Sequence, residues 1–186
     1  MARLSGKRII LGVSGGIAAY KSCDLASRLV KEGAVVTAVL TPGARKFVTP
    51  YAFEALTGQP CLTRLFKRIR TGENAYPHIE PAKTAELVII APATADLIAR
   101  LAHGMADDLL STLMLSIRCP AIACPAMNVQ MWQHPATQAN AEKLTSYGYT
   151  LLGPDSGSLA CGMEGAGRMV EPLEIVDAAC KALKKR

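Results

Sequence analysis

The stretch from Arg8 to Val13 reads RIILGV, residues 14–16 read SGG, and residues 17–32 read IAAYKSCDLASRLVKE. The first part is a short apolar run that ends at the glycine turn, as a buried strand does. In the third part, small and apolar residues recur at helical spacing. They are Ala18, Ser22, Leu25 and Leu29. The stretch therefore predicts a strand, a glycine turn and a helix.

The same alternation continues along the chain. Strand candidates follow at residues 35–40, 87–91, 121–124 and 149–152, and helical stretches lie at residues 51–57, 79–85, 107–116, 135–147 and 172–184. Such alternation implies right-handed crossovers and a parallel sheet with helices on both faces. The 186 residues with 50% hydrophobic content support one core. We therefore expect an α/β fold in which residues 1–186 form one domain around a doubly wound parallel sheet.

The charge, the apolar runs and the cysteine spacing limit which partners the protein can bind and where it is located. The net charge is +6, but the positive residues are scattered except for a tail cluster that suits the end of a last helix. No stretch reaches the roughly 20 apolar residues of a membrane span, and the N-terminus lacks a signal-peptide pattern. None of the six cysteines forms the C-x2-C spacing of a zinc site. We expect a cytoplasmic protein with free thiols that binds no metal, nucleic acid or membrane.

The residues that follow each strand are unusual, and a ligand of such a sheet binds at the carboxyl ends of the strands. They read SGG at 14–16, TPG at 41–43, PATAD at 92–96 and PAMN at 125–128, and a glycine-rich stretch spans 153–169. Free amides and the helix dipole at the first turn favour a phosphate, although small residues there also serve close packing alone. The second strand ends without the acid that would hold a ribose, which disfavours NAD and leaves a mononucleotide.

Residues 12–16, GVSGG, also match the G-x-S-x-G pattern of serine hydrolases. The match follows the first strand, and none of the three histidines lies in a context distinctive of a hydrolase triad. A hydrolase is therefore the weaker interpretation.

Three segments stand in order along the chain: His78-Ile79-Glu80, residues 125–132 (PAMNVQMW) and residues 160–169 (ACGMEGAGRM). Together they resemble the phosphopantothenoylcysteine decarboxylase family of homo-oligomeric, flavin-containing cysteine decarboxylases. The resemblance covers essentially the whole chain, and P-x-M-N-x-x-M-W is its most specific part. It is closest to the amino-terminal half of the bacterial bifunctional coenzyme A biosynthesis protein, without the synthetase half.

The resemblance implies a Rossmann-like flavoprotein with FMN at a subunit interface of a homotrimer or a tetramer of trimers. It implies decarboxylation of 4'-phospho-N-pantothenoylcysteine to 4'-phosphopantetheine, and it leaves open a separate phosphopantothenate–cysteine ligase as a partner. The implied flavin contacts are Ser14, Gly15, Gly16, Thr41, Phe47, Thr94, Asp96, Leu97, Ser111 and Ala126, with Thr112 as a further candidate. The implied substrate contacts are Asn128, Ala160, Gly162 and Met169. Asp107 departs from close relatives, which often have Asn there.

The chemistry of this reaction requires a cofactor. Loss of carbon dioxide from a simple cysteine carboxyl would leave a carbanion without an electron sink. If FMN accepts a hydride from the thiol-bearing carbon, the resulting thioaldehyde places the carboxylate beta to a C=S group, and the released electrons move onto sulfur. The enethiol is then reduced when the hydride returns and an acid protonates the neighbouring carbon.

The resemblance implies catalytic roles for His78, Asn128 and Cys161. A neutral imidazole accepts a proton near pH 7, which suits His78 as the base for thiol oxidation. The amide of Asn128 binds the carboxylate less strongly than Lys or Arg would, so the group leaves more readily as carbon dioxide. Cys161 lies in the stretch 153–169, where we expect a flexible flap, and a thiol with an ordinary pKa of about 8.5 supplies the acid. In isolation each residue also has a purely structural interpretation.

Three other functions remain open. Peptidyl-cysteine decarboxylases stop at the oxidised enethiol, and flavin prenyltransferases share the fold but lack the P-x-M-N pattern. Some relatives are non-catalytic flavin-binding regulatory subunits, which usually have lost a catalytic residue or gained an acidic tail. This chain has all three candidate catalytic residues and no acidic tail, which favours an enzyme, a carboxy-lyase.

Overall fold

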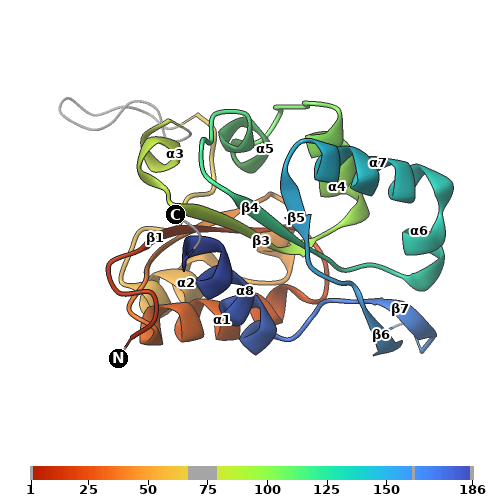
Figure 1. Cartoon of the computed structure of the whole chain (residues 1–186), viewed down its shortest axis with the longest axis horizontal. Coiled ribbons are helices and arrows are strands. Elements are labelled where there is room, and N and C mark those ends of the chain that lie inside the picture. The colour runs from red at the N-terminus through yellow and green to blue at the C-terminus, as the bar shows by residue number, and fades with distance from the viewer. Residues whose placement is uncertain (1, 67–78, 161, 185–186) are drawn as a thin grey trace.

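The centre of the molecule is a five-stranded parallel sheet in the order β2-β1-β3-β4-β5 (Figure 1). The structure, a computed structural model, describes residues 2–66, 79–160 and 162–184. The strands are β1 (Arg8–Val13), β2 (Val35–Leu40), β3 (Leu87–Ala93), β4 (Ala121–Pro125) and β5 (Tyr149–Leu151). The chain runs from β1 outward to β2 and then crosses to β3 on the other side of β1. This reversal creates a switch point between β1 and β3, where open α/β sheets bind their ligands.

Helices cover both faces of the sheet (Figure 1). One face packs against α1 (Ala19–Lys31), α2 (Pro50–Thr57) and α8 (Pro172–Lys184). The other packs against α3 (Glu80–Thr84), α4 (Ala95–Ala102), α5 (Leu109–Met114) and α7 (Pro135–Ser146). None of the helices in the described residues is long and apolar enough to span a membrane.

Burial on both faces explains why the central strands are continuous apolar runs. In β1, Ile9 and Leu11 point into the core under α1 and α8, whereas Ile10 points into the core under α4 and α5. All three are at most 2% exposed. Each such side chain contributes about 1.5–3 kcal/mol when it is fully buried.

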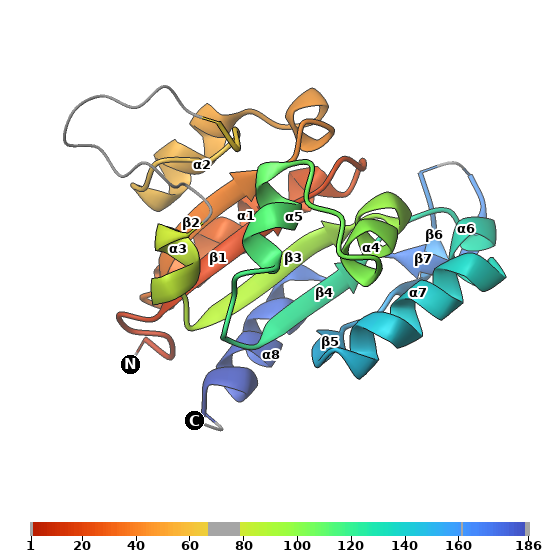
Figure 2. The same ribbon diagram turned by 90° about the horizontal axis from the view of Figure 1, so that it is seen from above.

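Small elements connect the layers at the carboxyl edge of the sheet. They are the 3-10 turn η1 (Ala44–Lys46), helix α6 (Val129–Gln133) and an antiparallel hairpin of β6 (Asp155–Ser158) and β7 (Glu164–Arg168). Figure 2 shows α6 and the hairpin beyond the carboxyl ends of β3 and β4, with both chain ends on the opposite side of the molecule. The carboxyl edge of the sheet is therefore bordered by connecting segments, away from both chain ends.

The predicted fold class is confirmed, including the parallel sheet covered on both faces. The bounds of β1 and β2 agree with the prediction, β3 runs two residues further and β4 one residue further, and β5 ends one residue earlier. The sequence reading missed α4, α6 and the hairpin. It also began α5 too early, because Asp108 is the N-cap of that helix and not part of it.

Candidate active site

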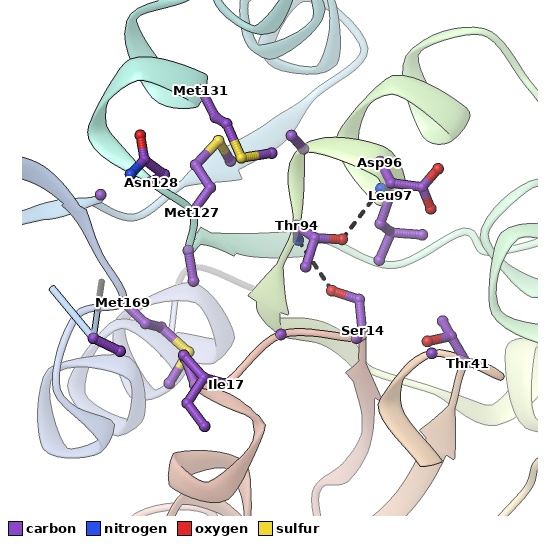
Figure 3. Close-up of a pocket in the computed structure, with 18 of the residues that line it drawn as sticks. Ser14, Ile17, Thr41, Thr94, Asp96, Leu97, Met127, Asn128, Met131 and Met169 are labelled. Carbon is purple, nitrogen blue, oxygen red and sulfur yellow. Dashed lines mark hydrogen bonds between the residues drawn. The ribbon is translucent and has the colours of Figure 1, made fainter. Parts of the chain in front are cut away.

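A pocket of about 1000 Å³ lies over the switch point and is built from the loops that follow β1, β2, β3 and β4, together with the hairpin β6–β7 (Figure 3). Its wall is more apolar than polar. Figure 3 shows Ile17 and Met169 on one side of the pocket and Thr41 and Asp96 on the other. The pocket therefore has an apolar end and a polar end.

Ser14 joins the ends of the two strands that flank the switch point. Its hydroxyl donates to the carbonyl of Pro92 at 2.7 Å and accepts from the amide of Thr94 at 3.0 Å. The side chain is only 2% exposed. Ser14 thus fixes the loop after β1 against the loop after β3, which is the floor of the pocket.

Gly15 lets the loops after β1 and β2 meet backbone to backbone. A Cβ on Gly15 would lie 2.6 Å from the carbonyl carbon of Gly43, a contact that real side chains do not make. The glycine therefore serves close packing. Within the described residues the amides of Gly15, Ile17 and Ala18 donate to no hydrogen-bond acceptor, so the same turn also offers free donors to a ligand. The glycine turn therefore both permits close packing and offers free amide donors.

The polar end of the pocket is formed at the start of α4. The hydroxyl of Thr94 caps this helix by accepting from the amide of Leu97 at 3.4 Å, and the first-turn amides of the helix face the same region. Thr41 lies opposite, and its hydroxyl accepts from the amide of Ala44 at 3.2 Å. Amides, hydroxyls and a helix dipole together suit the phosphate of a nucleotide.

Arg100 lies on the wall and is surrounded by carboxylates. Its guanidinium donates to Asp96 at 3.0 Å and to Asp107, and it lies 3.9 Å from Asp108. The hydrogen bond from Arg100 lowers the pKa of Asp107 below its usual range. Asp108 in turn caps α5. The cluster fixes α4 relative to the start of α5.

Asn128 follows β4 and faces the hairpin. Its Oδ1 accepts from the amide of Gln130 at 2.8 Å, which caps α6, and its Nδ2 donates to the sulfur of Met163 at 3.1 Å. The amide of Met127 donates to the carbonyl of Gly167 at 2.9 Å. Strand β7 is thereby attached to the segment that carries Asn128.

Most of the predicted site residues come together in this pocket. Those that line it are Ser14, Gly15, Gly16, Thr41, Thr94, Asp96, Leu97, Ala126, Asn128, Ala160 and Met169. Four do not line it in the single chain: Phe47 is half exposed, Ser111 is buried with its hydroxyl bonded to Asp108, the hydroxyl of Thr112 donates to the carbonyls of Ala106 and Asp108, and Gly162 lies outside the lining. The roles of all of them remain predictions.

Two predicted catalytic residues, His78 and Cys161, lie outside the described residues. Among the described cysteines all five are free thiols. Cys124 is fully buried in β4, and burial raises the pKa of its thiol far above the ordinary value. Cys180 is buried as well, whereas Cys23, Cys61 and Cys119 are half-buried.

Sequence reasoning missed several lining residues, chiefly Lys21, Arg100, Arg168 and Glu171. Arg168 lies inside a segment that carries the family resemblance and Lys21 lies on the first predicted helix, but no pattern assigned either of them a role. Arg100 pairs with Asp96 of its own helix and with Asp107, and Glu171 pairs with Lys21 of α1, but no sequence pattern assigned either residue to a ligand site.

Known proteins are similar to nearly the whole chain. The model of the Flavoprotein family matches residues 2–184. The coenzyme A biosynthesis bifunctional protein CoaBC of Escherichia coli (strain K12) is 53% identical over 176 residues, 95% of this chain and 43% of that protein. CoaBC of Bacillus subtilis (strain 168) is 44% identical over 178 residues, 96% of this chain and 43% of that protein. The chain thus spans less than half the length of the curated relatives that it matches.

Solved structures are similar over nearly the whole chain. A cysteine-to-serine mutant of PPC decarboxylase complexed with pantothenoylaminoethenethiol has a TM-score of 0.82 and 29% identity, covering 94% of this chain and 96% of that one. The FMN binding protein AtHal3 has a TM-score of 0.83 and 28% identity, covering 97% and 98%. With the matched family model and the close relatives, these similarities establish that the chain belongs to the Flavoprotein family.

Proposed function

We propose that this chain binds FMN and converts 4'-phospho-N-pantothenoylcysteine into 4'-phosphopantetheine, a step of coenzyme A biosynthesis. The observation that carries the proposal is the attachment of the hairpin β6–β7 to the segment of Asn128, over one pocket at the switch point. The names of the relatives and of the similar structures support the same reaction.

The pocket fits FMN by its donors and its size. Free amides at residues 15, 17 and 18 and the capped start of α4 suit the phosphate, and about 1000 Å³ leaves room for a flavin together with a substrate. When bound, FMN supplies a reversible acceptor for two electrons and a proton. The protein residues supply binding, orientation and proton transfer.

Asn128 is proposed to bind the carboxylate that leaves. Its Nδ2 already donates to a weak acceptor, the sulfur of Met163, and a carboxylate is a stronger acceptor for the same group. The amide carries no charge, so it orients the carboxylate without holding the anion as tightly as a cation would. Loss of neutral carbon dioxide is then less opposed.

Apolar side chains surround this end of the pocket. Ile17, Met127, Met131 and Met169 line it, and Figure 3 shows them on the side where Asn128 lies. An apolar wall limits the water around the reacting carboxylate. It therefore favours the uncharged product over the charged reactant.

His78 and Cys161 complete the proposed chemistry. His78 is assigned as the base that removes the thiol proton, and Cys161 as the acid that protonates the carbon next to the reduced centre. In the sequence Cys161 stands between β6 and β7, whose described arms pack beside Asn128. We propose that the segment 153–169 closes over the substrate as a flap.

Assembly and location are part of the proposal. We infer a cytoplasmic homo-oligomer, a trimer or a tetramer of trimers, in which the flavin lies between subunits. The exposed apolar side chains of Ile17 and Tyr20 beside the pocket, and of Phe47 near it, suit such an interface. The phosphopantothenate–cysteine ligase activity is supplied either by a further part of the same polypeptide or by a separate partner.

The reaction is tested with purified protein, FMN and 4'-phospho-N-pantothenoylcysteine, by measuring carbon dioxide and the thiol product. We expect 4'-phosphopantetheine from the wild type. Cys161→Ser should retain yellow FMN and still release carbon dioxide, but it should accumulate the oxidised enethiol. Full turnover by this variant would remove the role assigned to Cys161.

A second variant tests the proposed base. His78→Asn should keep its flavin and lose decarboxylation, because the thiol is no longer deprotonated as it is oxidised. Wild-type rates in this variant would refute the assignment of His78.

A further inference from the structure

The side chain of Asn128 is held at both of its polar ends, and one partner is a methionine to which the proposed reaction gives no role. Its Oδ1 accepts from the backbone amide of Gln130 at 2.8 Å, and its Nδ2 donates to Sδ of Met163 at 3.1 Å. A backbone N–H is only a donor, and a thioether sulfur is only an acceptor. A flipped amide would place donor against donor at one end, so these two contacts determine where the nitrogen of Asn128 lies.

Met163 is itself fixed in place by the hairpin. It stands directly before β7, and its carbonyl accepts from the amide of Leu159, just after β6, at 2.8 Å. Four residues further along, the carbonyl of Gly167 accepts from the amide of Met127. The side chain of Met163 is half-buried. The sulfur therefore projects from a backbone that is bonded to the opposite arm of the hairpin and, through β7, to the segment of Asn128.

A thioether is suited to orienting an amide that must also bind a carboxylate. Sulfur is a weak, polarizable acceptor without charge, so it fixes the plane of the amide and with it the directions of both N–H groups of Nδ2. A carboxylate is the stronger acceptor, so the sulfur does not outcompete it for the same nitrogen. The stem of Met163 is apolar, and Figure 3 shows Met127 and Met131 beside Asn128 as well. The amide is thus oriented without a further charge beside it.

We propose that Met163 is a positioning residue for the decarboxylation. Its sulfur holds the amide plane of Asn128, so that the nitrogen is aimed when the carboxylate that leaves arrives. This inference rests on the proposed function. It assigns the effect to the hydrogen-bond acceptor at position 163, whereas a residue that only filled space would be replaceable by an apolar side chain of similar volume.

Two substitutions at position 163 separate the acceptor from the bulk. Met163→Leu keeps an apolar side chain of similar size and removes the acceptor, so kcat/KM for 4'-phospho-N-pantothenoylcysteine should fall roughly tenfold. Met163→Gln is polar but supplies a carbonyl oxygen, so it should stay within about threefold of the wild type. A packing role predicts the opposite order, with leucine tolerated and glutamine harmful. Both variants should keep the wild-type FMN content, measured by absorbance.

A binding measurement tests whether the effect is specific to the carboxylate. The FMN-loaded proteins are titrated in a calorimeter with 4'-phospho-N-pantothenoylserine, which keeps the carboxylate but lacks the thiol that is oxidised. A second titration uses 4'-phosphopantetheine, which lacks the carboxylate. Met163→Leu should bind the serine analogue roughly fivefold to tenfold more weakly than the wild type and bind 4'-phosphopantetheine equally well.

A double-mutant cycle identifies the partner through which Met163 acts. Asn128→Asp has no N–H to donate, so adding Met163→Leu to it should change the residual kcat/KM by less than about twofold. A further tenfold loss in the double variant would show that Met163 acts independently of Asn128, and would contradict the proposal.

Met105 supplies the matched control, since it is half exposed and lies outside the pocket lining. Met105→Leu and Met105→Gln should both behave as the wild type does. Wild-type kinetics in Met163→Leu together with a loss in Met163→Gln would overturn the positioning role, as would equal weakening of both ligands in Met163→Leu. A flavin-loaded wild type that releases no carbon dioxide from 4'-phospho-N-pantothenoylcysteine would instead overturn the proposed function, and this inference with it.

Discussion

The Asn128 side chain has two polar atoms, and each faces a different neighbour. Its oxygen caps α6 and its amide nitrogen contacts Met163 of the hairpin. The cap fixes the rotamer, so the nitrogen is held toward the flap and the pocket before any substrate binds. A fixed donor loses less conformational entropy when the substrate carboxylate arrives.

Asn128→Asp separates the helix cap made by the side-chain oxygen from the donor supplied by the amide nitrogen. The carboxylate still accepts the amide of Gln130, so the cap and the fold remain, but the donor is lost and a negative charge faces the substrate carboxylate. We expect kcat/KM to fall by at least about a hundredfold with FMN content unchanged. Steady-state kinetics and the flavin absorbance measure both quantities. A rate within a few-fold of wild type would mean that Asn128 only caps the helix.

Asp107 allows a prediction about pH. Its hydrogen bond from Arg100 holds its folded pKa below the ordinary 3.8, so it stabilises the fold above that pH and loses this contribution as the pH falls through the lower folded value. Asp107→Asn should therefore unfold at lower urea concentration than wild type at neutral pH. The two midpoints should converge as the pH falls through the lowered pKa of Asp107. A difference that persists undiminished in acid would assign the effect to something other than this charge.

Site residues that follow a strand could be predicted from sequence, and those defined by distant partners could not. Ser14 and Thr94 stand directly after β1 and β3, Asn128 stands three residues after the end of β4, and all three line the pocket. Lys21 and Arg168 meet only because Glu171 lies between them in the folded chain. No local spacing in the sequence predicts that these two side chains lie close together.

At the scale of elements, the hairpin β6–β7 depends on glycine where it contacts the rest of the protein. A Cβ on Gly167 would lie 2.3 Å from the carbonyl oxygen of Met127, and one on Gly165 would lie 2.9 Å from the side chain of Val129. Backbone therefore packs directly on the segment that carries Asn128. The arms of the proposed flap have a fixed attachment, on which its function depends.

Gly167→Ala tests this attachment. The methyl group must displace β7 from the Asn128 segment, because a backbone oxygen cannot move aside cheaply. We expect kcat to fall at least about tenfold while FMN stays bound. Gly104→Ala is the control, since Gly104 also has a positive φ but nothing lies within 4 Å of its added Cβ. Equal activity losses in both variants would point to general backbone strain instead.

Gly15→Ala tests the contact between the loops after β1 and β2. The added Cβ would meet the backbone of Gly43, so the two loops must separate and the donors of the pocket floor shift. The dissociation constant for FMN, measured by fluorescence titration, should rise at least about tenfold. Gly16→Ala should have a smaller effect, because its Cβ would meet only the Thr94 side chain at 3.3 Å. Unchanged FMN affinity in Gly15→Ala would contradict this account.

Elements with a strong period were predicted well, and elements made by capping or by glycine were not. Strand β1 and helix α1 follow directly from residues 8–32, because burial dictates their pattern. The start of α4 reads PATAD and resembles a loop, yet Thr94 caps a helix there. The hairpin was expected as flexible loop because glycines weaken strand propensity, whereas here they permit close packing.

At the scale of the whole molecule, the pocket unites residues from all parts of the chain. Lys21, Thr41, Thr94, Asn128 and Arg168 are each contributed by a different loop or element, and all lie at the carboxyl edge of one sheet. The strand order alone predicts that edge, since the reversal beside β1 keeps neighbouring loops apart and leaves space between them. The size of the pocket and its two ends emerge only from the packed structure.

We propose that this pocket holds the flavin on which carboxyl loss depends. The most direct measurement is an equilibrium titration of the purified, flavin-free chain with FMN, followed by visible absorbance and flavin fluorescence. We expect saturable binding of one FMN per chain, with a yellow protein that then releases carbon dioxide from the cysteine-derived substrate. A chain that stays colourless and takes up no FMN would contradict it.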